Sequence, residues 1–239
     1  MKDFLLLEWD THFFGYKIAS VRASEFGLKR IKIIIRELEE QDIKLAYCFV
    51  DPDDNVSNDS LRQIPGFLAD EKVTYSIEVT NEINFPVTDH ITAYNLKNTT
   101  GKLKNLALQS GLYSRFKIDP AFQNNEFERL YTEWIEKSVD RKLANEVLIY
   151  KEGNELLGFI TLALRGKTGS IGLIAVDENQ RGKAIGKKLV GAALEYFNTH
   201  KITCVEVVTQ KANFAACRFY ESCGFKIKSI VNIYHLWIR

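Results

Sequence analysis

Apolar positions recur with helical spacing in several segments of the chain. Near the N-terminus, Ile31, Ile34, Ile35 and Leu38 share one face of a helix. The same period predicts helices over residues 127–138, 185–197 and 213–222. Around the helix that contains Ile31 and Leu38, the pattern from Phe4 to about Leu96 predicts short strands.

Short apolar runs predict the strands of a sheet. They cover residues 45–50, 73–79, 146–150, 156–164, 171–176, 204–208 and 225–237. Both faces of the run 156–164 are apolar, which is typical of a central strand. Strands that alternate with helices predict an α/β (α+β) fold with a mixed central sheet flanked by helices. Because Asn98–Gly101 is a polar break, we predict a smaller α/β N-terminal domain over residues 1–97 and a second domain over residues 98–239.

Composition and charge narrow the classes of partner. The chain has 46% hydrophobic and 26% charged residues, as globular proteins do. Its 32 Lys and Arg against 31 Asp and Glu give a net charge of +1, which argues against a general nucleic-acid binder. No apolar run reaches the roughly 18 residues of a membrane span, so we expect a cytoplasmic protein with no membrane partner. The four cysteines show no CxxC spacing, and we predict no metal site.

One turn has the spacing of a phosphate-binding site. Residues 176–186 run from a predicted strand through a polar turn into a helix, with small residues at Gly182, Ala184 and Gly186. Small side chains let main-chain N–H groups approach a ligand, and the first turn of a helix favours a diphosphate. Arg181 and Lys183 would add charge-assisted contacts. The alternative is a solvated basic surface turn, and the spacing by itself favours neither.

The arrangement around this turn resembles a known family. The strand, the turn, the long helix, the next strand and the segment 213–225 are similar to the GCN5-related N-acetyltransferase (GNAT) family over roughly the last hundred residues. The family pattern is Gln or Arg, two residues, Gly, one residue, then Gly or Ala. Here it is Arg181, Ala184 and Gly186, and Ala184 departs from the pattern.

This resemblance implies a GNAT fold with acetyl-CoA as co-substrate. The turn is expected to bind the pyrophosphate, and Ile174 and Val176 of the preceding strand to pair with the pantetheine arm like an added strand. Asn213 is expected to contact the same arm. The implied acetyl-CoA-binding residues are Ile174, Ala175, Val176, Gln180, Arg181, Gly182, Lys183, Ala184, Ile185, Gly186 and Asn213.

Tyr220 is the candidate catalytic residue, as general acid. The spacing of Asn213, Ala216 and Tyr220 places all three on one helix face. A departing thiolate needs a proton, and transfer from a phenol of pKa about 10 to a thiolate whose thiol has a pKa of about 8.5 is uphill by roughly 2 kcal/mol. The alternative is a core tyrosine paired with Phe219. None of the four histidines lies in a motif, so we expect water or a main-chain carbonyl to accept the amine proton.

Three short segments resemble one branch of the family, the TDP-fucosamine acetyltransferases. They are Leu7–Gly15, Tyr113–Phe116 and Val208–Gln210. The resemblance implies a nucleotide-linked 4-amino-4,6-dideoxyhexose as small-molecule substrate and a role in polysaccharide biosynthesis. Trp9 and Phe14 are candidate substrate-binding residues, with an aromatic core cluster as the alternative. Arg115 is a candidate for the substrate diphosphate, with a solvated loop arginine as the alternative.

Two other functions stay open at this point. A protein N-terminal or small-amine acetyltransferase would share the CoA site but would have a groove for a peptide or polyamine. A non-catalytic acyl-CoA-binding module would need no acid at Tyr220. Strand edges near the C-terminus offer a surface through which a homodimer could form.

Overall fold

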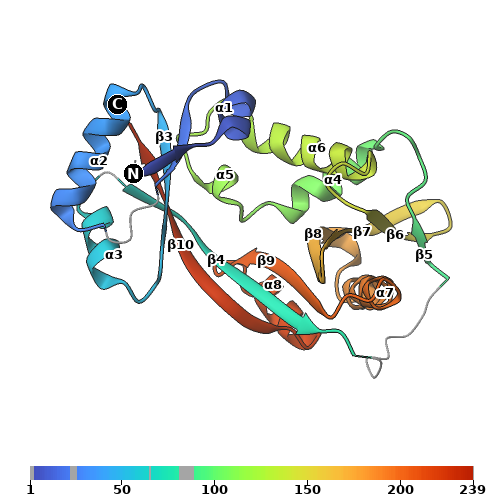
Figure 1. The fold of residues 1–239 in the computed structure, drawn as a ribbon. Coiled ribbons are helices and arrows are strands. Elements are labelled where there is room, and N and C mark those ends of the chain that lie inside the picture. The colour runs from blue at the N-terminus through green and yellow to red at the C-terminus, as the bar shows by residue number, and fades with distance from the viewer. Residues whose placement is uncertain (1–2, 22–25, 65, 81–88, 239) are drawn as a thin grey trace. The chain divides into compact units, whose positions relative to one another are not determined.

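The structure, a computed structural model, describes residues 3–21, 26–64, 66–80 and 89–238 (Figure 1). Its helices are α1 (Glu8–Phe14), α2 (Leu28–Glu40), α3 (Asn55–Arg62), α4 (Gly101–Ser110), α5 (Arg115–Ile118), α6 (Glu126–Val139), α7 (Ile185–Thr199) and α8 (Phe214–Ser222), with the 3-10 helix η1 (Glu178–Gln180). Its strands are β1 (Phe4–Leu6), β2 (Ile18–Val21), β3 (Leu45–Val50), β4 (Gly66–Glu78), β5 (Ile91–Ala93), β6 (Glu146–Glu152), β7 (Glu155–Arg165), β8 (Thr168–Val176), β9 (Cys204–Gln210) and β10 (Lys226–Trp237). The predicted mixed α/β architecture is confirmed.

The described residues form two compact units. Unit 1 comprises those within 1–73, 210–212 and 229–239, and unit 2 comprises those within 74–209 and 213–228. Strands β4 and β10 therefore each contribute residues to both units. The units do not follow the predicted boundary at residue 97, because the last residues of the chain belong with the first ones. The predicted division into 1–97 and 98–239 stays a prediction about domain organisation.

Strand pairing follows the order β1-β2-β3-β10-β4-β9-β8-β7-β6-β5. In unit 1, β3 is parallel to β2 and antiparallel to β10. In unit 2, β7 is antiparallel to both β6 and β8, and β8 is parallel to β9. The prediction that residues 156–164 form a central strand is confirmed, since β7 is paired along both edges.

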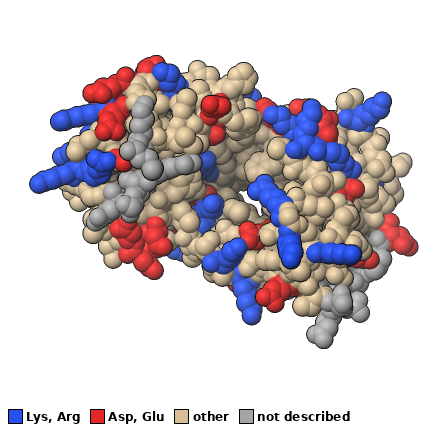
Figure 2. Space-filling model, viewed as in Figure 1, with Lys and Arg blue, Asp and Glu red and all other residues tan. Residues whose placement is uncertain are grey.

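Charged side chains of both signs are interspersed on the face drawn in Figure 2. This distribution agrees with the near-balance of acidic and basic residues in the sequence. Within the described ranges, no helix is both long and apolar enough to cross a lipid bilayer.

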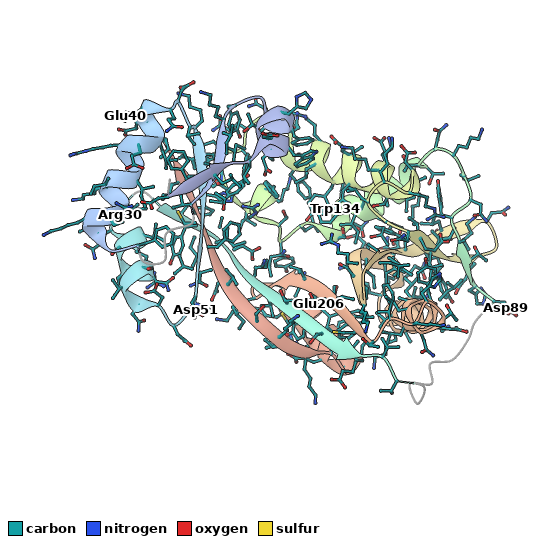
Figure 3. All side chains as sticks on the ribbon, viewed as in Figure 1. Arg30, Glu40, Asp51, Asp89, Trp134 and Glu206 are labelled. Atoms are coloured by element: carbon teal, nitrogen blue, oxygen red, sulfur yellow. The ribbon has the colours of Figure 1, made fainter. Side chains whose placement is uncertain are left out.

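In unit 2, helices cover both faces of the strands β6 to β8. Helix α7 packs on one face through its apolar stripe, which includes Ile185, Leu189 and Phe197, all buried. Helices α4 and α6 lie on the opposite face (Figure 1). The Trp134 side chain of α6 is labelled in Figure 3, and its Nε1 would lie 3.7 Å from a Cβ at Gly172 of β8. The helices on both faces exclude water from the apolar strands between them. The alternation of strands and helices along the sequence predicted this arrangement.

Unit 1 has its core between α2 and its strands. Ile31, Ile34 and Leu38 of α2 are fully buried against side chains of β2, β3 and β10. Each such side chain contributes about 1.5–3 kcal/mol of burial free energy. Helix α2 and strand β3, at Leu45–Val50, match their predicted positions.

Several helices lie where the sequence pattern indicated strands or no regular structure. Helices α1 and α3 fall in the segment predicted as short strands around one helix, so that prediction was wrong there. Helix α3 has only Val56 and Leu61 as apolar residues, too few to show a period. It begins because the Asp54 side chain accepts a hydrogen bond from the Ser57 N–H at 3.0 Å. Helix α4 begins in the same way, with Thr100 capping Leu103.

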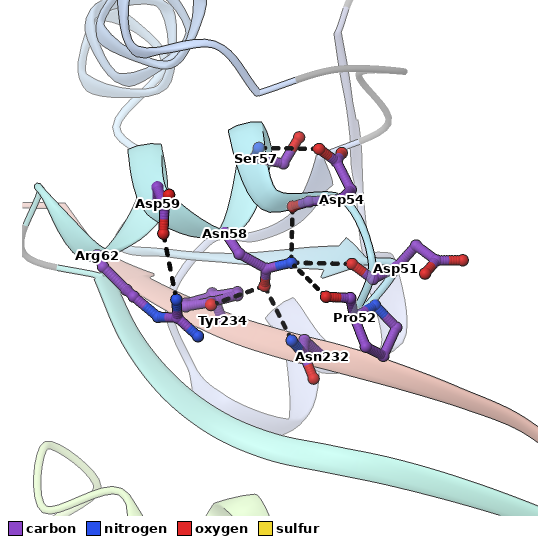
Figure 4. Close-up of polar contacts among 9 residues, drawn as sticks. All are labelled: Asp51, Pro52, Asp54, Ser57, Asn58, Asp59, Arg62, Asn232 and Tyr234. Atoms are coloured by element: carbon purple, nitrogen blue, oxygen red, sulfur yellow. Dashed lines mark hydrogen bonds and ion pairs between the residues drawn. The ribbon is translucent and has the colours of Figure 1, made fainter.

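A buried amide fixes α3 against the C-terminal strand of unit 1 (Figure 4). The Asn58 Nδ2 group donates to the carbonyls of Asp51 at 2.9 Å and Asp54 at 2.7 Å. Its Oδ1 accepts from Asn232 Nδ2 at 2.8 Å and from the Tyr234 hydroxyl at 2.9 Å. A buried amide with both ends bonded orients the elements it joins, which explains how a polar helix becomes part of the core.

Candidate active site

The turn between β8 and α7 contains two residues with a positive φ, separated by Lys183. Gly182 has φ 82° and Ala184 has φ 60°, both in the left-handed region. Ala184 is the N-cap residue of α7, and the exposed stretch 181–184 leads directly into the helix. The free N–H groups of the first turn of α7 are therefore next to an exposed, basic, small-residue loop. The predicted strand, turn and helix context is confirmed in its backbone.

Asp177 anchors the start of this turn. Its carboxylate accepts a hydrogen bond from the Asn179 N–H at 2.9 Å and forms an ion pair with Lys102 of α4. The Lys102 ammonium, followed by the Asn179 N–H, holds the pKa of this carboxyl below its usual range. The sequence analysis did not single out either residue. An acidic residue directly after a strand and before a helix is a cap signal that could have identified Asp177, but no local signal identifies Lys102.

The basic side chains of the turn have local partners. The Arg181 Nε donates to the Val176 carbonyl at 3.4 Å. The Lys183 ammonium donates to the Gln180 side-chain carbonyl at 2.7 Å. Both residues are exposed, so their charges remain accessible to an anion.

Strand β8 leaves its parallel partner before it reaches the turn. Its ladder with β9 ends at the pair Ile171 and Val207 among the described residues, although both strands continue. On the other edge, pairing with β7 extends as far as Val176. Residues 172–176 therefore present a backbone edge toward β9 that no ladder uses. Ile174 and Val176, which were predicted to pair with the pantetheine arm, lie on this segment.

Helix α8 brings its side chains to the start of α7. The Asn213 side chain caps α8 by accepting a hydrogen bond from the Ala216 N–H at 3.1 Å. A Cβ at Gly186 would lie 3.0 Å from the Phe219 ring, so this ring contacts the first turn of α7. The structure thus brings Gly186 and the residue before Tyr220 together, although they are far apart in the sequence.

Tyr220 lies in an aromatic cluster. The residue is 4% exposed, and its ring centroid is 5.3 Å from that of Phe219 and 5.8 Å from that of Tyr75. Burial raises the pKa of the Tyr220 phenol, and the neighbouring Cys223 and Cys217 thiols raise it further. Next to it, the Tyr75 hydroxyl donates to Glu221 at 2.8 Å. The alternative of a core tyrosine paired with Phe219 is thus also visible in the packing, and the catalytic role of Tyr220 stays a prediction.

The predicted substrate residues lie on different elements. Trp9 on α1 is 49% exposed, and its ring stacks on that of Phe13 with a centroid distance of 5.1 Å. Phe14 is buried, and its ring also contacts Phe13. Trp9 and Phe14 therefore belong to one aromatic cluster of unit 1. Arg115 is the first residue of α5 in unit 2, and its guanidinium lies 4.5 Å from the centroid of the Phe116 ring. Their roles toward a substrate stay predictions. Among the described residues, no cluster of His, Cys, Asp and Glu side chains has the arrangement of a metal site.

Comparison with known proteins agrees with this geometry. Residues 112–225 match the model of the acetyltransferase (GNAT) family. A GCN5-related N-acetyltransferase from Sphaerobacter thermophilus has a similar fold, with a TM-score of 0.65 at 15% identity over 99% of this chain and 76% of that one. The predicted GNAT fold is therefore confirmed.

Two curated relatives are similar in sequence. A dTDP-fucosamine acetyltransferase of Escherichia coli is 25% identical over 225 residues, which cover 93% of each protein. The spore coat polysaccharide biosynthesis protein SpsD of Bacillus subtilis is 28% identical over 138 residues, or 58% of this chain. That match spans 47% of the length of the Bacillus protein. Residues 112–225, somewhat less than half of the chain, are thus similar to the acetyltransferase (GNAT) family.

Proposed function

We propose that the protein transfers the acetyl group of acetyl-CoA to the amine of a nucleotide-linked aminosugar, of the dTDP-4-amino-4,6-dideoxyhexose type. The observation that carries the proposal is the unpaired edge of β8 at residues 172–176, which leads directly into the N-terminus of α7. An extended thioester arm can add to such an edge like a strand, while its diphosphate reaches the helix N-terminus. Few other ligands need both features side by side.

The backbone of the turn supports diphosphate binding. The left-handed conformations at Gly182 and Ala184 turn the chain so that successive N–H groups can converge on one anion. The helix dipole of α7 favours negative charge at the same place. Arg181 and Lys183 add exposed positive charge. Asp177 and Lys102 fix the beginning of the turn, which lowers the entropy that binding would otherwise cost.

Tyr220 is proposed as the general acid of a direct transfer. The amine nitrogen attacks the thioester carbonyl carbon, a C–N bond forms and the C–S bond breaks. The leaving sulfur carries negative charge, which a phenol hydroxyl can stabilise by donating a hydrogen bond and then a proton. Because burial keeps the Tyr220 phenol in its protonated form, the donor is present at neutral and mildly alkaline pH.

The amine requires no strong base in this scheme. The nitrogen of an aminosugar is flanked by electron-withdrawing carbon and oxygen, so its pKa should be near the 8 or so of an α-amine. A useful fraction is then neutral near pH 8, and water or a main-chain carbonyl can accept the proton released after attack. Alignment of the two substrates then supplies most of the rate.

The choice of acceptor rests on the relatives. The similarity to the dTDP-fucosamine acetyltransferase extends over 93% of both chains. The name of the Bacillus relative refers to polysaccharide biosynthesis. Both favour an aminosugar over a peptide or polyamine. We propose that Arg115 binds the substrate diphosphate and that Trp9 and Phe14 contribute to the acceptor site.

An acceptor panel tests the proposal. The purified protein is incubated with acetyl-CoA and nucleotide-linked aminosugars, peptides or polyamines, and released thiol is followed. We expect release with a nucleotide-linked 4-amino-4,6-dideoxyhexose and at least tenfold less with the free sugar, a peptide or a polyamine. Thiol release with peptides or polyamines, but with no aminosugar, would show that the acceptor is a peptide or a polyamine and not a nucleotide-linked sugar. Binding of acetyl-CoA without release by any amine would indicate a non-catalytic binding module.

A further inference from the structure

A β-bulge in β8 marks the point where this strand leaves β9. Ile160 pairs with Ile174 and Leu162 pairs with Ile171, so Thr161 of β7 faces two residues of β8, Gly172 and Leu173. The ladder with β9 ends at Ile171, one residue before the bulge. Because a bulge bends the strand that carries it, the separation of β8 from β9 begins where the extra residue is inserted.

The side chain of Thr161 fastens this bulge. Its hydroxyl oxygen accepts a hydrogen bond from the Leu173 N–H at 2.8 Å, and the residue is 2% exposed. A Cβ on Gly172 would lie 2.8 Å from the same oxygen and 3.7 Å from the Trp134 Nε1, so a side chain at 172 would displace the hydroxyl. The structure therefore couples three features: a buried threonine, a residue without a side chain opposite it, and one amide turned toward a hydroxyl.

Loss of that hydroxyl would leave the Leu173 amide without its acceptor. A buried N–H must find another partner, which here means a carbonyl of β7 or of β9. Pairing with β7 would shift the register of β8, and pairing with β9 would extend the parallel ladder past Ile171. Either change moves or occupies the backbone groups of Ile174 and Val176.

We propose that Thr161 is a positioning residue for acetyl-CoA. Its hydroxyl holds the bulge that keeps the edge of residues 173–176 free for the pantetheine arm. The inference rests on the proposed function, since it names a residue that prepares the same site without touching the ligand. It predicts an effect on acetyl-CoA affinity that exceeds any effect on the chemical step.

The test compares two substitutions of Thr161. Thr161→Val keeps the shape and removes the acceptor, and Thr161→Ser keeps the acceptor. For Thr161→Val we expect the Kd of CoA by calorimetry, and the KM for acetyl-CoA, to rise about tenfold with kcat changed less than about threefold. Thr161→Ser should keep the Kd of CoA and the KM for acetyl-CoA within about threefold of the values of the unsubstituted protein. The matched control is Ser138→Ala on α6, which removes an equally buried hydroxyl bonded to the Trp134 carbonyl at 2.8 Å and should leave both constants unchanged.

Amide exchange in the unsubstituted protein gives an independent measurement, which stands even where Thr161→Val fails to fold. The Leu173 amide should exchange slowly without ligand, and CoA should slow exchange between residues 174 and 176. Rapid exchange at Leu173 would overturn the inference. Unchanged CoA affinity in folded Thr161→Val would overturn it too, while leaving the proposed function intact. If the unsubstituted protein binds neither CoA nor acetyl-CoA, the proposed function fails, and with it the role of Thr161.

Discussion

Tyr220 offers a direct test of acid catalysis, because its ring and its hydroxyl have separable roles. Tyr220→Phe keeps the packing against Phe219 and Tyr75 but removes the proton donor. We expect kcat to fall about 100-fold, as is typical for loss of a general acid, with the KM for acetyl-CoA changed less than about threefold. Steady-state thiol-release kinetics measure both constants. The pKa of the phenol is raised, so its ionisation should depress the rate only above pH 10 or so.

The neighbouring Tyr75 supplies the control for that substitution. It is also buried, but its hydroxyl donates to Glu221. Tyr75→Phe should keep kcat within about threefold of the unsubstituted enzyme. Equal losses in the two variants would show that packing of the cluster, and not proton donation, governs the rate. The raised pKa of the Tyr220 phenol also affects the stability of the fold. The stabilisation by the neutral Tyr220 phenol is fully present below pH 10 or so and is lost as the pH rises through the folded-state pKa.

Ala184 adopts a backbone conformation that costs free energy for any residue with a Cβ. Its φ of 60° is in the left-handed region, where glycine has no such penalty. We expect Ala184→Gly to raise the free energy of unfolding by about 0.5–1 kcal/mol and the Tm by about 1–4 °C. Removal of the methyl group should also tighten acetyl-CoA binding up to a few-fold. Thermal denaturation and calorimetry measure the two effects.

Ala192, in the middle of α7, is the control with the opposite sign. There the backbone is helical, so Ala192→Gly should lower stability by about 0.5–1 kcal/mol. A loss of stability in Ala184→Gly as well would mean that the methyl group makes contacts that outweigh the strain.

The ion pair between Asp177 and Lys102 connects helix α4 to the turn that begins α7. It makes the position of the turn depend on an element far away in the sequence. Lys102→Met should therefore weaken acetyl-CoA binding about three- to tenfold without a change in the turn's own residues. Calorimetric titration with CoA measures the effect, and Lys104→Met is the control, since Lys104 pairs with Glu136 on α6 instead. Equal affinity in all three proteins would contradict the anchoring role.

The same pair predicts a pH dependence of stability. The pKa of Asp177 is lowered in the folded state, so its contribution is fully present above the ordinary carboxyl pKa of about 4 and is lost as the pH falls through the folded-state value. The stability difference between the unsubstituted protein and Asp177→Asn should then be constant from pH 7 to about 5 and shrink below about 4. Urea denaturation at a series of pH values measures it. A difference that persists at pH 2.5 would assign the effect to the uncharged hydrogen bonds of Asp177.

The path of the chain predicts that its first part does not fold separately. Strand β3 of unit 1 pairs with β10, from Asn232 with Val50 to Trp237 with Leu45, so unit 1 needs the last residues of the chain. A fragment of residues 1–97 would expose the buried faces of β3 and α2 and lose the bonds of Asn58 to Asn232 and Tyr234. We expect it to give the circular dichroism and NMR dispersion of an unfolded chain. A cooperatively folded fragment would support a domain boundary at residue 97.

Local patterns predicted the elements that have many apolar residues. The periods of α2, α6, α7 and α8 and the run Leu45–Val50 were sufficient, because a buried face repeats within a few residues. The apolar pattern did not predict helix α3. This helix packs on its neighbours through the hydrogen bonds of the buried Asn58 side chain, and it has no apolar stripe. The turn at Gly182 and Ala184 was located from spacing, but the left-handed conformation of Ala184 was not, because alanine seldom adopts it.

The sequence alone located the helices and strands with many apolar residues, the small-residue turn and the position of Tyr220 on its helix, since each of these depends on neighbours within about ten residues. Only the tertiary structure decided that β8 separates from β9 beyond Ile171, that Phe219 contacts Gly186 and that Lys102 anchors Asp177. These contacts join residues that are distant in the chain. Packing and pairing of whole elements select them, and no local pattern of side chains encodes that choice.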